Sequence, residues 1–229
     1  MKRNIFIFAL LAMFAVTAQA QIQTDPAKRA AEIQNEKNKA TRWVAKLELN
    51  DPEKEARVID VITTHIMAVR DWHNTHPVKD VPDGINPRFP GSKMSGPEKE
   101  VFINSTKPAS VHENLMSGLR ADLTEPQVEQ ILDEYTESKV AFTMNGYREM
   151  ILDMTPQEDA ALLAILKKWR EQAVGYKNMK AVSVVFEMAK TECELWLYQN
   201  DRNFKKLYAE WAVRRNAAKA AREAAAANQ

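Results

Sequence analysis

The spacing of apolar residues is the feature that most constrains the fold of this chain. In segment 52–72, Val58, Ile62, Ile66 and Val69 recur at three- and four-residue steps, which is the period of one face of an α-helix. Similar stripes run through segments 124–135, 156–173, 179–198 and 203–211. No segment alternates apolar and polar residues with a period of two over a useful length, as a half-buried strand would. The sequence therefore predicts an all-α fold, an irregular multi-helix bundle.

The starts of several predicted helices share one sequence pattern. Asn50, Thr124 and Thr155 each follow a large apolar residue, precede a proline by one or two positions, and have Glu or Gln three residues later. This is the pattern of a capping box, in which the first side chain and the third residue satisfy each other's backbone N–H groups. Ser110 with Glu113 repeats the spacing. We expect four helices to begin in this way, and a further helix to begin at Thr24-Asp25-Pro26.

A long segment, 75–109, departs from the helical pattern. It contains six of the ten prolines and half of the glycines, and only its part 98–104 is predicted to be helical. A connection of this length inside a compact domain is unusual and often functional. Val81, Ile85, Phe89 and Met94 could anchor it. We expect this long proline-rich loop to fold back onto the helices and to close a polar hollow there.

The two ends of the chain differ from its middle. Lys2 and Arg3 precede an apolar run over residues 5–16 that is too short to span a membrane as a helix, and Ala18 and Ala20 fit a signal peptidase site. We expect residues 1–20 to be a signal peptide cleaved between Ala20 and Gln21, with a retained N-terminal anchor as the alternative. The expected location is periplasmic or secreted. No later segment is apolar over 18 residues, so we expect no stable membrane insertion after cleavage.

The mature chain is predicted to contain a single helical domain over residues 21–213 and an Ala-rich helical tail over residues 214–229. After Val213 no apolar residue is larger than alanine, so the tail has high helix propensity but no face to bury. We expect this C-terminal helix to project into solvent.

Composition excludes two features. The chain has 32 Lys and Arg against 31 Asp and Glu, and this balance argues against nucleic acid as a partner, because nucleic-acid-binding proteins carry an excess of basic residues. Cys193 is the single cysteine, so an intrachain disulfide is impossible. Its apolar neighbours at helical spacing predict a buried thiol.

Four segments resemble a family of secreted Bacteroidota proteins that share a domain of unknown function. They are "DGINP" (83–87), "KPASVHENLMSGLRADLTEPQVEQILDEYT" (107–136), "AFTMNGYREMI" (141–151) and "YQNDRNFKKLYAEW" (198–211). Members of that family are often encoded near polysaccharide-degrading enzymes. The resemblance extends from about residue 46 to residue 211 and implies an extracytoplasmic location in a setting of glycan use. It supplies no catalytic residues that could be transferred to this chain.

Candidate binding residues gather in the sequence around the long loop. Asp71, Trp72, His73 and His76 lie at the predicted end of a helix, and a second group surrounds the loop and the helices that follow it. Planar amides, arginine and aromatic rings suit sugar hydroxyls and uronate carboxylates. We therefore predict an acidic oligosaccharide as the ligand. The predicted site residues are Asp71, Trp72, His73, His76, Asn86, His112, Arg120, Asn145 and Tyr147, with Arg88, Glu113 and Asn114 beside them.

Each of these residues also has a structural interpretation. Asn86 and Asn145 precede Pro87 and Gly146 and fit turns, and His65 fits a hydrogen-bonded residue at the edge of the core. His73 and His76 are three residues apart and could hold a metal with Asp71 or His112, but two histidines alone are a weak signal. We expect no metal and no cofactor.

Three functions remain open from the sequence. The leading hypothesis is an accessory or binding protein in extracytoplasmic glycan utilisation. The first alternative is a carbohydrate-active hydrolase or lyase that uses His73, His76 or His112. The second is a periplasmic helical chaperone, because Leu123-Thr124-x-x-Gln127 resembles a motif of small periplasmic stress chaperones. The sequence does not decide whether the protein is an enzyme, nor its oligomeric state.

Overall fold

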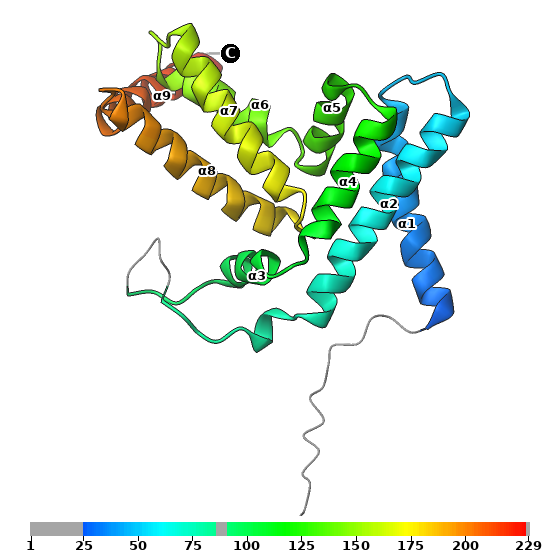
Figure 1. The fold of residues 1–229 in the computed structure, drawn as a ribbon. Coiled ribbons are helices and arrows are strands. Elements are labelled where there is room, and N and C mark those ends of the chain that lie inside the picture. The colour runs from blue at the N-terminus through cyan, green and yellow to red at the C-terminus, as the bar shows by residue number, and fades with distance from the viewer. Residues whose placement is uncertain (1–24, 86–90, 228–229) are drawn as a thin grey trace, which may run out of the picture.

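The computed structural model describes residues 25–85 and 91–227, and over these ranges the chain is helical (Figure 1). The helices are α1 (Pro26–Ala45), α2 (Pro52–Thr75), η1 (Val78–Asp80, a 3₁₀ helix), α3 (Gly96–Ser105), α4 (Ala109–Asp122), α5 (Glu125–Tyr135), α6 (Lys139–Met150), α7 (Pro156–Ala173), α8 (Met179–Gln199) and α9 (Phe204–Ala227). Over the same ranges the only strand-like pairing is one isolated bridge between Ile85 and Lys93. The predicted all-α class is confirmed.

The helices bury two separate groups of apolar side chains. The first core lies among α1, α2, α4 and α5 and includes Val44 and Leu119. The second core lies among α6, α7 and α8, with the first turn of α9 against it, and includes Leu166 and Phe186. Figure 1 shows the two groups of helices inclined to each other, with α3 near one end of both. Cys193 is fully buried in the second core, as predicted.

The two cores meet at the C-terminal end of α7. Val174 packs in the first core, and Arg170, only 1% exposed, turns its guanidinium toward α5. Its Nη1 donates to Asp133 Oδ1 at 2.8 Å, and its Nη2 lies 2.7 Å from Glu129 Oε2. Burial opposes the charge, but the hydrogen bonds to both carboxylates outweigh it and raise the pKa of Arg170. A buried charge is costly without its partners, so this contact fixes α5 against α7.

Two of the predicted capping boxes are formed. At α7, the Glu158 N–H donates to Thr155 Oγ1 at 3.2 Å, and Glu158 Oε2 accepts from the Thr155 N–H at 2.7 Å. At α5, Gln127 Oε1 accepts from the Thr124 N–H at 3.0 Å. These side chains satisfy backbone donors that a helix start leaves free, so the pattern around Thr124 is accounted for by local structure.

The other two predicted boxes are wrong. The cap of α2 is Asp51, whose Oδ1 accepts from the Lys54 N–H at 3.0 Å, while Asn50 takes a left-handed conformation with a φ of 55° one residue earlier. Ser110 already lies inside α4, which begins at Ala109 with Pro108 as its cap and no capping side chain. The cap of α2 thus lies one residue after Asn50, and the cap of α4 lies two residues before Ser110.

The predicted turn at Asn145-Gly146 is also wrong. Both residues lie inside α6, which runs without a break from Lys139 to Met150. Met144 and Tyr147, three residues apart on one face, are buried in the second core. Their packing outweighs the weak local preference of Asn-Gly for a turn.

Part of the long loop forms helices that pack on the body. The predicted helix 98–104 is α3, which starts two residues earlier because Ser95 and Glu98 form a capping box, with the same spacing as those of α5 and α7, that the prediction overlooked. Ile103 of α3 is buried, and its carbonyl accepts from Trp72 Nε1 at 3.2 Å. The loop therefore folds back onto α2 at α3, while Asn86, Arg88 and Phe89 lie outside the described residues.

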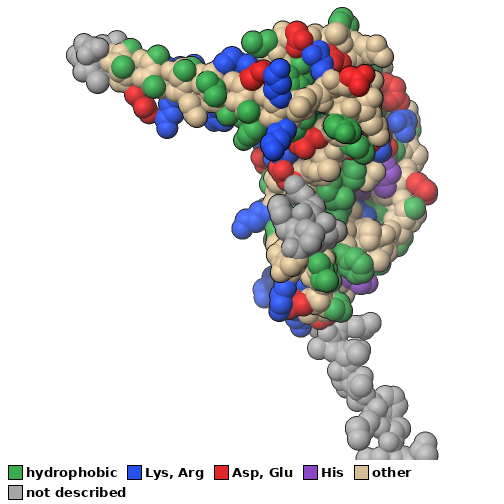
Figure 2. All heavy atoms as spheres, turned by 90° about the vertical axis from the view of Figure 1, so that its left-hand side faces the viewer, with side chains coloured by type: hydrophobic (Ala, Val, Ile, Leu, Met, Phe, Trp, Pro, Cys, Tyr) green, Lys and Arg blue, Asp and Glu red, His purple; other side chains and the backbone are tan. Residues whose placement is uncertain are grey.

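The ends of the described chain follow the predicted pattern. The predicted signal peptide, residues 1–20, lies outside the described residues, and α1 begins with Asp25 Oδ1 accepting from the Ala27 N–H at 3.0 Å. The first buried residue of α1 is Ala40. At the other end, Phe204 and Leu207 hold the first turns of α9 on the second core, and Arg214 donates to the carbonyls of Glu149 and Met150 at the end of α6. The part of α9 beyond this contact projects from the body (Figure 2). None of the described helices is long and apolar enough to cross a membrane.

The contact of α4 with α2 depends on Gly118. A Cβ at this position would lie 2.8 Å from both Cγ atoms of Val61. We predict that Gly118→Ala lowers the free energy of unfolding by about 1–3 kcal/mol, because a β-branched side chain cannot move aside, and that Val61→Ala restores part of the loss. Urea unfolding of the single and double variants measures this coupling.

Gly146→Ala is the matched control, because Gly146 is helical and a Cβ added there would have no atom within 4 Å. It should raise stability by about 0.5–1 kcal/mol, since alanine favours a helix over glycine. Equal effects of the two glycine substitutions would contradict the close packing of α2 on α4.

Candidate functional site

A groove of about 780 Å³ lies between the two cores. We call it the intercore groove. It is lined by side chains from residues 36–46 of α1, 66–74 of α2, 133–138 at the end of α5, and 174–182 where α7 connects to α8. A groove of this size and position is the usual setting of a ligand site, because it draws side chains from several rigid elements.

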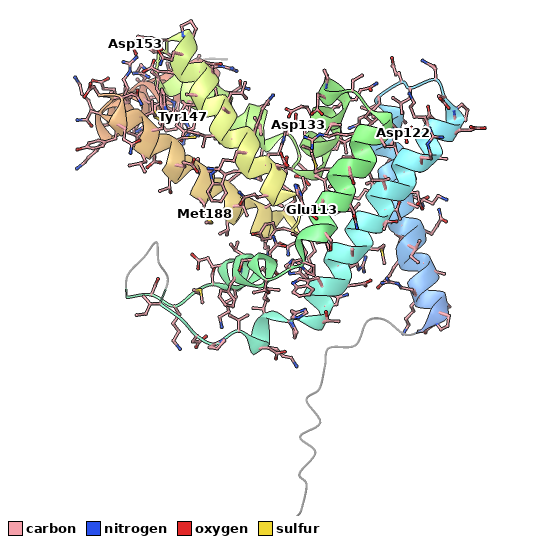
Figure 3. The ribbon with its side chains drawn as sticks, in the orientation of Figure 1. Glu113, Asp122, Asp133, Tyr147, Asp153 and Met188 are labelled. Carbon is pink, nitrogen blue, oxygen red and sulfur yellow. The ribbon has the colours of Figure 1, made fainter. Side chains whose placement is uncertain are left out.

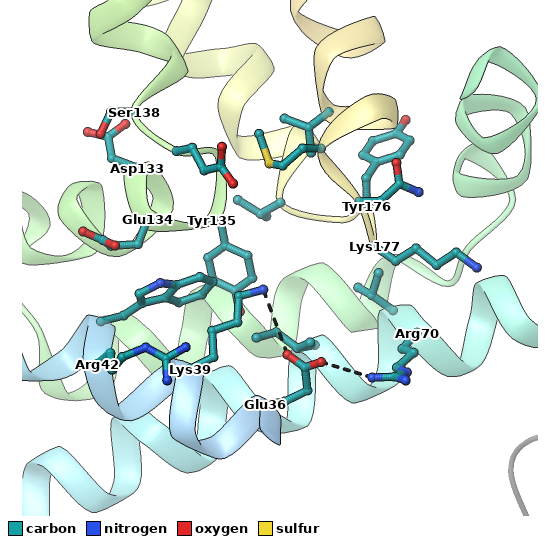
Figure 4. A pocket seen from close by; sticks show the side chains of 18 of the residues that line it. Glu36, Lys39, Arg42, Arg70, Asp133, Glu134, Tyr135, Ser138, Tyr176 and Lys177 are labelled. Carbon is teal, nitrogen blue, oxygen red and sulfur yellow. Dashed lines mark hydrogen bonds and ion pairs between the residues drawn. The ribbon is translucent and has the colours of Figure 1, made fainter. Parts of the chain in front are cut away.

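Basic side chains line both walls of the groove (Figure 4). Lys46 is paired with Glu134 at 2.7 Å, and Arg70 lies 3.1 Å from Glu36. Arg42 on α1 and Lys177 after α7 are exposed, and within residues 25–85 and 91–227 neither has a carboxylate at ion-pair distance. The groove thus carries two cations without an ion-pair partner in the described part of the protein, together with one such carboxylate, Glu137.

Aromatic side chains form the floor and one wall of the groove. The rings of Trp43 and Tyr135 are 4.8 Å apart and tilted by 54°, and Lys39 Nζ lies 5.0 Å from the Trp43 ring. Trp43 is only 8% exposed, so it gives the floor rigidity and offers little surface to a ligand. Tyr176 is half-buried on the facing wall (Figure 4) and is the aromatic ring better placed to contact a ligand.

The predicted residues at the end of α2 tie that end to neighbouring helices. Asp71 accepts two hydrogen bonds from Arg29 of α1, each of 2.6 Å. His76 stacks on Trp72 with ring centroids 3.8 Å apart, and its Nδ1 lies 2.9 Å from the Trp72 carbonyl oxygen. These three side chains line neither the intercore groove nor the smaller cavity described below. Their contacts hold the end of α2 against α1 and α3.

The other predicted site residues lie apart from those at the end of α2. Arg120 Nε donates to Glu125 Oε1 at 2.9 Å at the start of α5, and Asn145 is exposed on α6. Tyr147 is buried in the second core, away from Glu113 on α4 (Figure 3), and its hydroxyl donates to the Lys190 carbonyl at 3.3 Å. Burial and the nearby Cys193 raise the pKa of Tyr147. Asn86 lies outside the described residues. The predicted residues therefore do not surround one cavity.

Two of the predicted residues, His73 and His112, do lie near the intercore groove and the start of α4. His73 is 3% exposed, and its ring centroid is 6.3 Å from that of Tyr176. His112 Nε2 lies 3.0 Å from Glu171 Oε1 on α7. Between them Lys107 Nζ donates to the Gly175 carbonyl at 3.0 Å, and burial lowers the pKa of this lysine to about 8. Sequence reasoning missed Lys107, Gly175 and Tyr176.

The expected core role of His65 is confirmed. This residue is 4% exposed, and its Nδ1 lies 3.1 Å from the Tyr135 hydroxyl. Burial, with a smaller contribution from the charges of Lys107 and His112, lowers its pKa to about 3. Among the described side chains, no group of three or more His, Cys, Asp and Glu is placed to hold a metal ion.

Comparison with known proteins places the chain in a protein family. The family described as "Protein of unknown function (DUF3826)" matches residues 33–217, and the chain belongs to it. No curated protein matches the chain. The matched range includes every wall of the intercore groove.

The buried histidines predict how stability depends on pH. Burial and the charges of Lys177 and Lys107 lower the pKa of His73 from 6.5 to about 4, and the pKa of His65 is lowered further. Between pH 6.5 and pH 4 the unfolded chain therefore binds protons that the folded chain does not, and the free energy of unfolding should fall as the pH is lowered.

His73→Phe keeps a ring in this position but removes its proton uptake. We predict a shallower fall of the unfolding free energy over the same pH range, measured by urea unfolding at a series of pH values. A slope equal to that of the wild type would show that His73 is accessible to protons in the folded protein.

Proposed function

We propose that the protein is a periplasmic or secreted accessory protein in glycan utilisation and that its intercore groove binds an acidic oligosaccharide. The observation that carries this proposal is the pair of unneutralised cations, Arg42 and Lys177, on two walls of one groove of the described chain. The N-terminal sequence and the resemblance to secreted proteins encoded near polysaccharide-degrading enzymes support the location and the setting.

The charges of the groove favour a ligand that carries carboxylates. A guanidinium binds a carboxylate through two parallel hydrogen bonds, and an ammonium binds it as a point charge. Arg42 and Lys177 belong to different elements, so they suit two acidic groups along a chain better than a single anion. Arg70 is already held by Glu36 and Glu32, and it can contribute hydrogen bonds without further ordering.

The remaining groups in the groove suit the neutral part of a sugar. Asn74 brings an amide group to the lining, whereas the Asn178 amide is already used, because its Nδ2 donates to Glu100 at 2.6 Å and its Oδ1 accepts from the Ala181 N–H at 3.0 Å. Tyr176 offers a half-buried ring on the facing wall. Amides can donate and accept at once, as sugar hydroxyls require.

The alternative functions have weaker support. A hydrolase or lyase would need its acid or base beside a bound substrate. His73 and His76 line neither described cavity, and His112, which lines the smaller cavity, is paired with Glu171 at 3.0 Å. A chaperone would need a broad apolar surface, whereas the walls of the intercore groove carry charged side chains from all four of its segments. Binding of an acidic glycan remains the function best supported by the groove.

Isothermal titration calorimetry with uronate-containing and neutral oligosaccharides of equal length tests the proposal. We predict saturable binding of the acidic series, weaker binding at higher salt, and little binding of the neutral series. Arg42→Gln and Lys177→Met should each weaken binding by about tenfold, the effect of losing one charge-assisted hydrogen bond.

Lys205→Met is the matched control, because Lys205 is exposed at the start of α9 and lies outside the groove. It should leave the affinity unchanged. Absence of heat with every acidic oligosaccharide, or equal affinities in Lys177→Met and Lys205→Met, would contradict the proposal.

A further inference from the structure

A second cavity, of about 350 Å³, lies beneath α3 on the other side of Tyr176. We call it the α3 pocket. It lies between α3, the start of α4, the end of α7, and α8, and its lining includes Asn104, Lys107, Trp169, Val185 and Met188. Met188 is labelled on α8 in Figure 3. A small cavity with apolar walls and a few polar groups is the form that specific small-molecule sites take.

Lys107 brings a positive charge into this pocket. Its Nζ donates to the Gly175 carbonyl at 3.0 Å, and among the described residues no carboxylate lies at ion-pair distance from it. An ammonium has three N–H donors, so donors remain for a ligand. A Cβ on residue 175 would lie 2.5 Å from this Nζ, so glycine is needed for the lysine to reach its position. The amine is thus held in place by the backbone.

Asn104 supplies a second polar group beside Lys107. Its Oδ1 is buried and makes no hydrogen bond of good geometry with any described residue. Burial lowers the pKa of His73 and raises the pKa of Tyr176, and the Asn104 side chain lies close enough to both rings to oppose these two shifts. Both the Oδ1 and the Nδ2 of Asn104 lie within 3.4 Å of the position that a Cβ on Gly175 would take, so this amide and the Lys107 amine converge on Gly175. Because buried acceptors are normally satisfied, this oxygen suits a ligand that donates a hydrogen bond.

Apolar side chains make up much of the remaining lining of the α3 pocket. Trp169 is oriented by Glu192, whose Oε2 accepts from its Nε1 at 2.6 Å, and Val101, Val185 and Met188 complete the wall. A fixed indole and a methionine sulfur make favourable contacts with an aromatic ring. The pocket therefore combines an apolar wall with a cation and a hydrogen-bond acceptor at one side.

We propose that the α3 pocket binds small hydroxy acids with an aromatic or branched apolar body. The carboxylate accepts from Lys107 Nζ, the hydroxyl donates to Asn104 Oδ1, and the apolar body lies against Trp169, Val185 and Met188. The inference does not rest on the groove's proposed ligand, because Arg42 and Lys177 do not line this pocket.

Titration of the purified protein with three related probes, followed by calorimetry and NMR, tests the proposal. Mandelate carries both polar groups, phenylacetate lacks the hydroxyl, and mandelamide lacks the charge. We expect saturable binding of mandelate at millimolar concentrations or below, and affinities about tenfold lower for each of the other two probes. Equal affinities of mandelate and mandelamide, or no saturable binding of mandelate, overturn the proposal.

Three variants assign the site. Lys107→Met should remove the preference for mandelate over mandelamide, and Met188→Trp should block binding by filling the pocket while Lys107 remains. Lys177→Met lies in the intercore groove and should leave mandelate binding unchanged. Thermal unfolding checks that each variant is folded. Mandelate binding that survives either Lys107→Met or Met188→Trp in a folded protein overturns the assignment, as does its loss in Lys177→Met.

Discussion

The architecture of this protein depends on one buried guanidinium. Arg170 leaves the second core at the end of α7 and binds Glu129 and Asp133 of α5, which belongs to the first core. Each core has its own apolar side chains, and few of these cross from one to the other, Val174 being the clearest case. Because a buried guanidinium is costly without its carboxylates, Arg170 keeps α5 against the end of α7 and so sets the distance between the two cores. The intercore groove, with Asp133 in its wall, is the space that this distance leaves.

The helical fold was predictable because its determinants are local. Apolar residues at helical spacing gave the helices, and Thr155 and Thr124 with their partners gave two of the starts. The predictions failed where packing decided between similar local choices. Asn145-Gly146 has a weak preference for a turn, but Met144 and Tyr147 are buried on one face of α6 and keep the helix continuous. Likewise, spacing alone could not show whether Asn50 or Asp51 caps α2, because both side chains can accept the same kind of hydrogen bond.

The site could be predicted only in part, because it is built from residues far apart in the sequence. Asp71, Trp72 and His76 are polar or aromatic and close to the loop, yet their groups are used by Arg29, by Ile103 and by one another. In the sequence, Arg42 and Lys177 look like ordinary exposed residues. They line one groove only because the fold brings α1 and the α7–α8 connection to its walls. Lys107 lies directly before a proline, and nothing in the sequence signals that Gly175 lets its amine approach.

Hydrogen exchange of Arg170→Met, compared with the wild type, tests most directly whether the guanidinium joins the two cores. Methionine keeps the apolar stem of Arg170 but leaves Asp133 without its partner and Glu129 with Lys167 alone. Because both carboxylates are partly exposed to water, we expect a loss of about 1–3 kcal/mol. The account predicts that α5 and the last turns of α7 lose protection, and that the helices of the two cores then exchange with different opening free energies. Unchanged protection of α5 in this variant, with both cores still opening together, would contradict the central role given to Arg170.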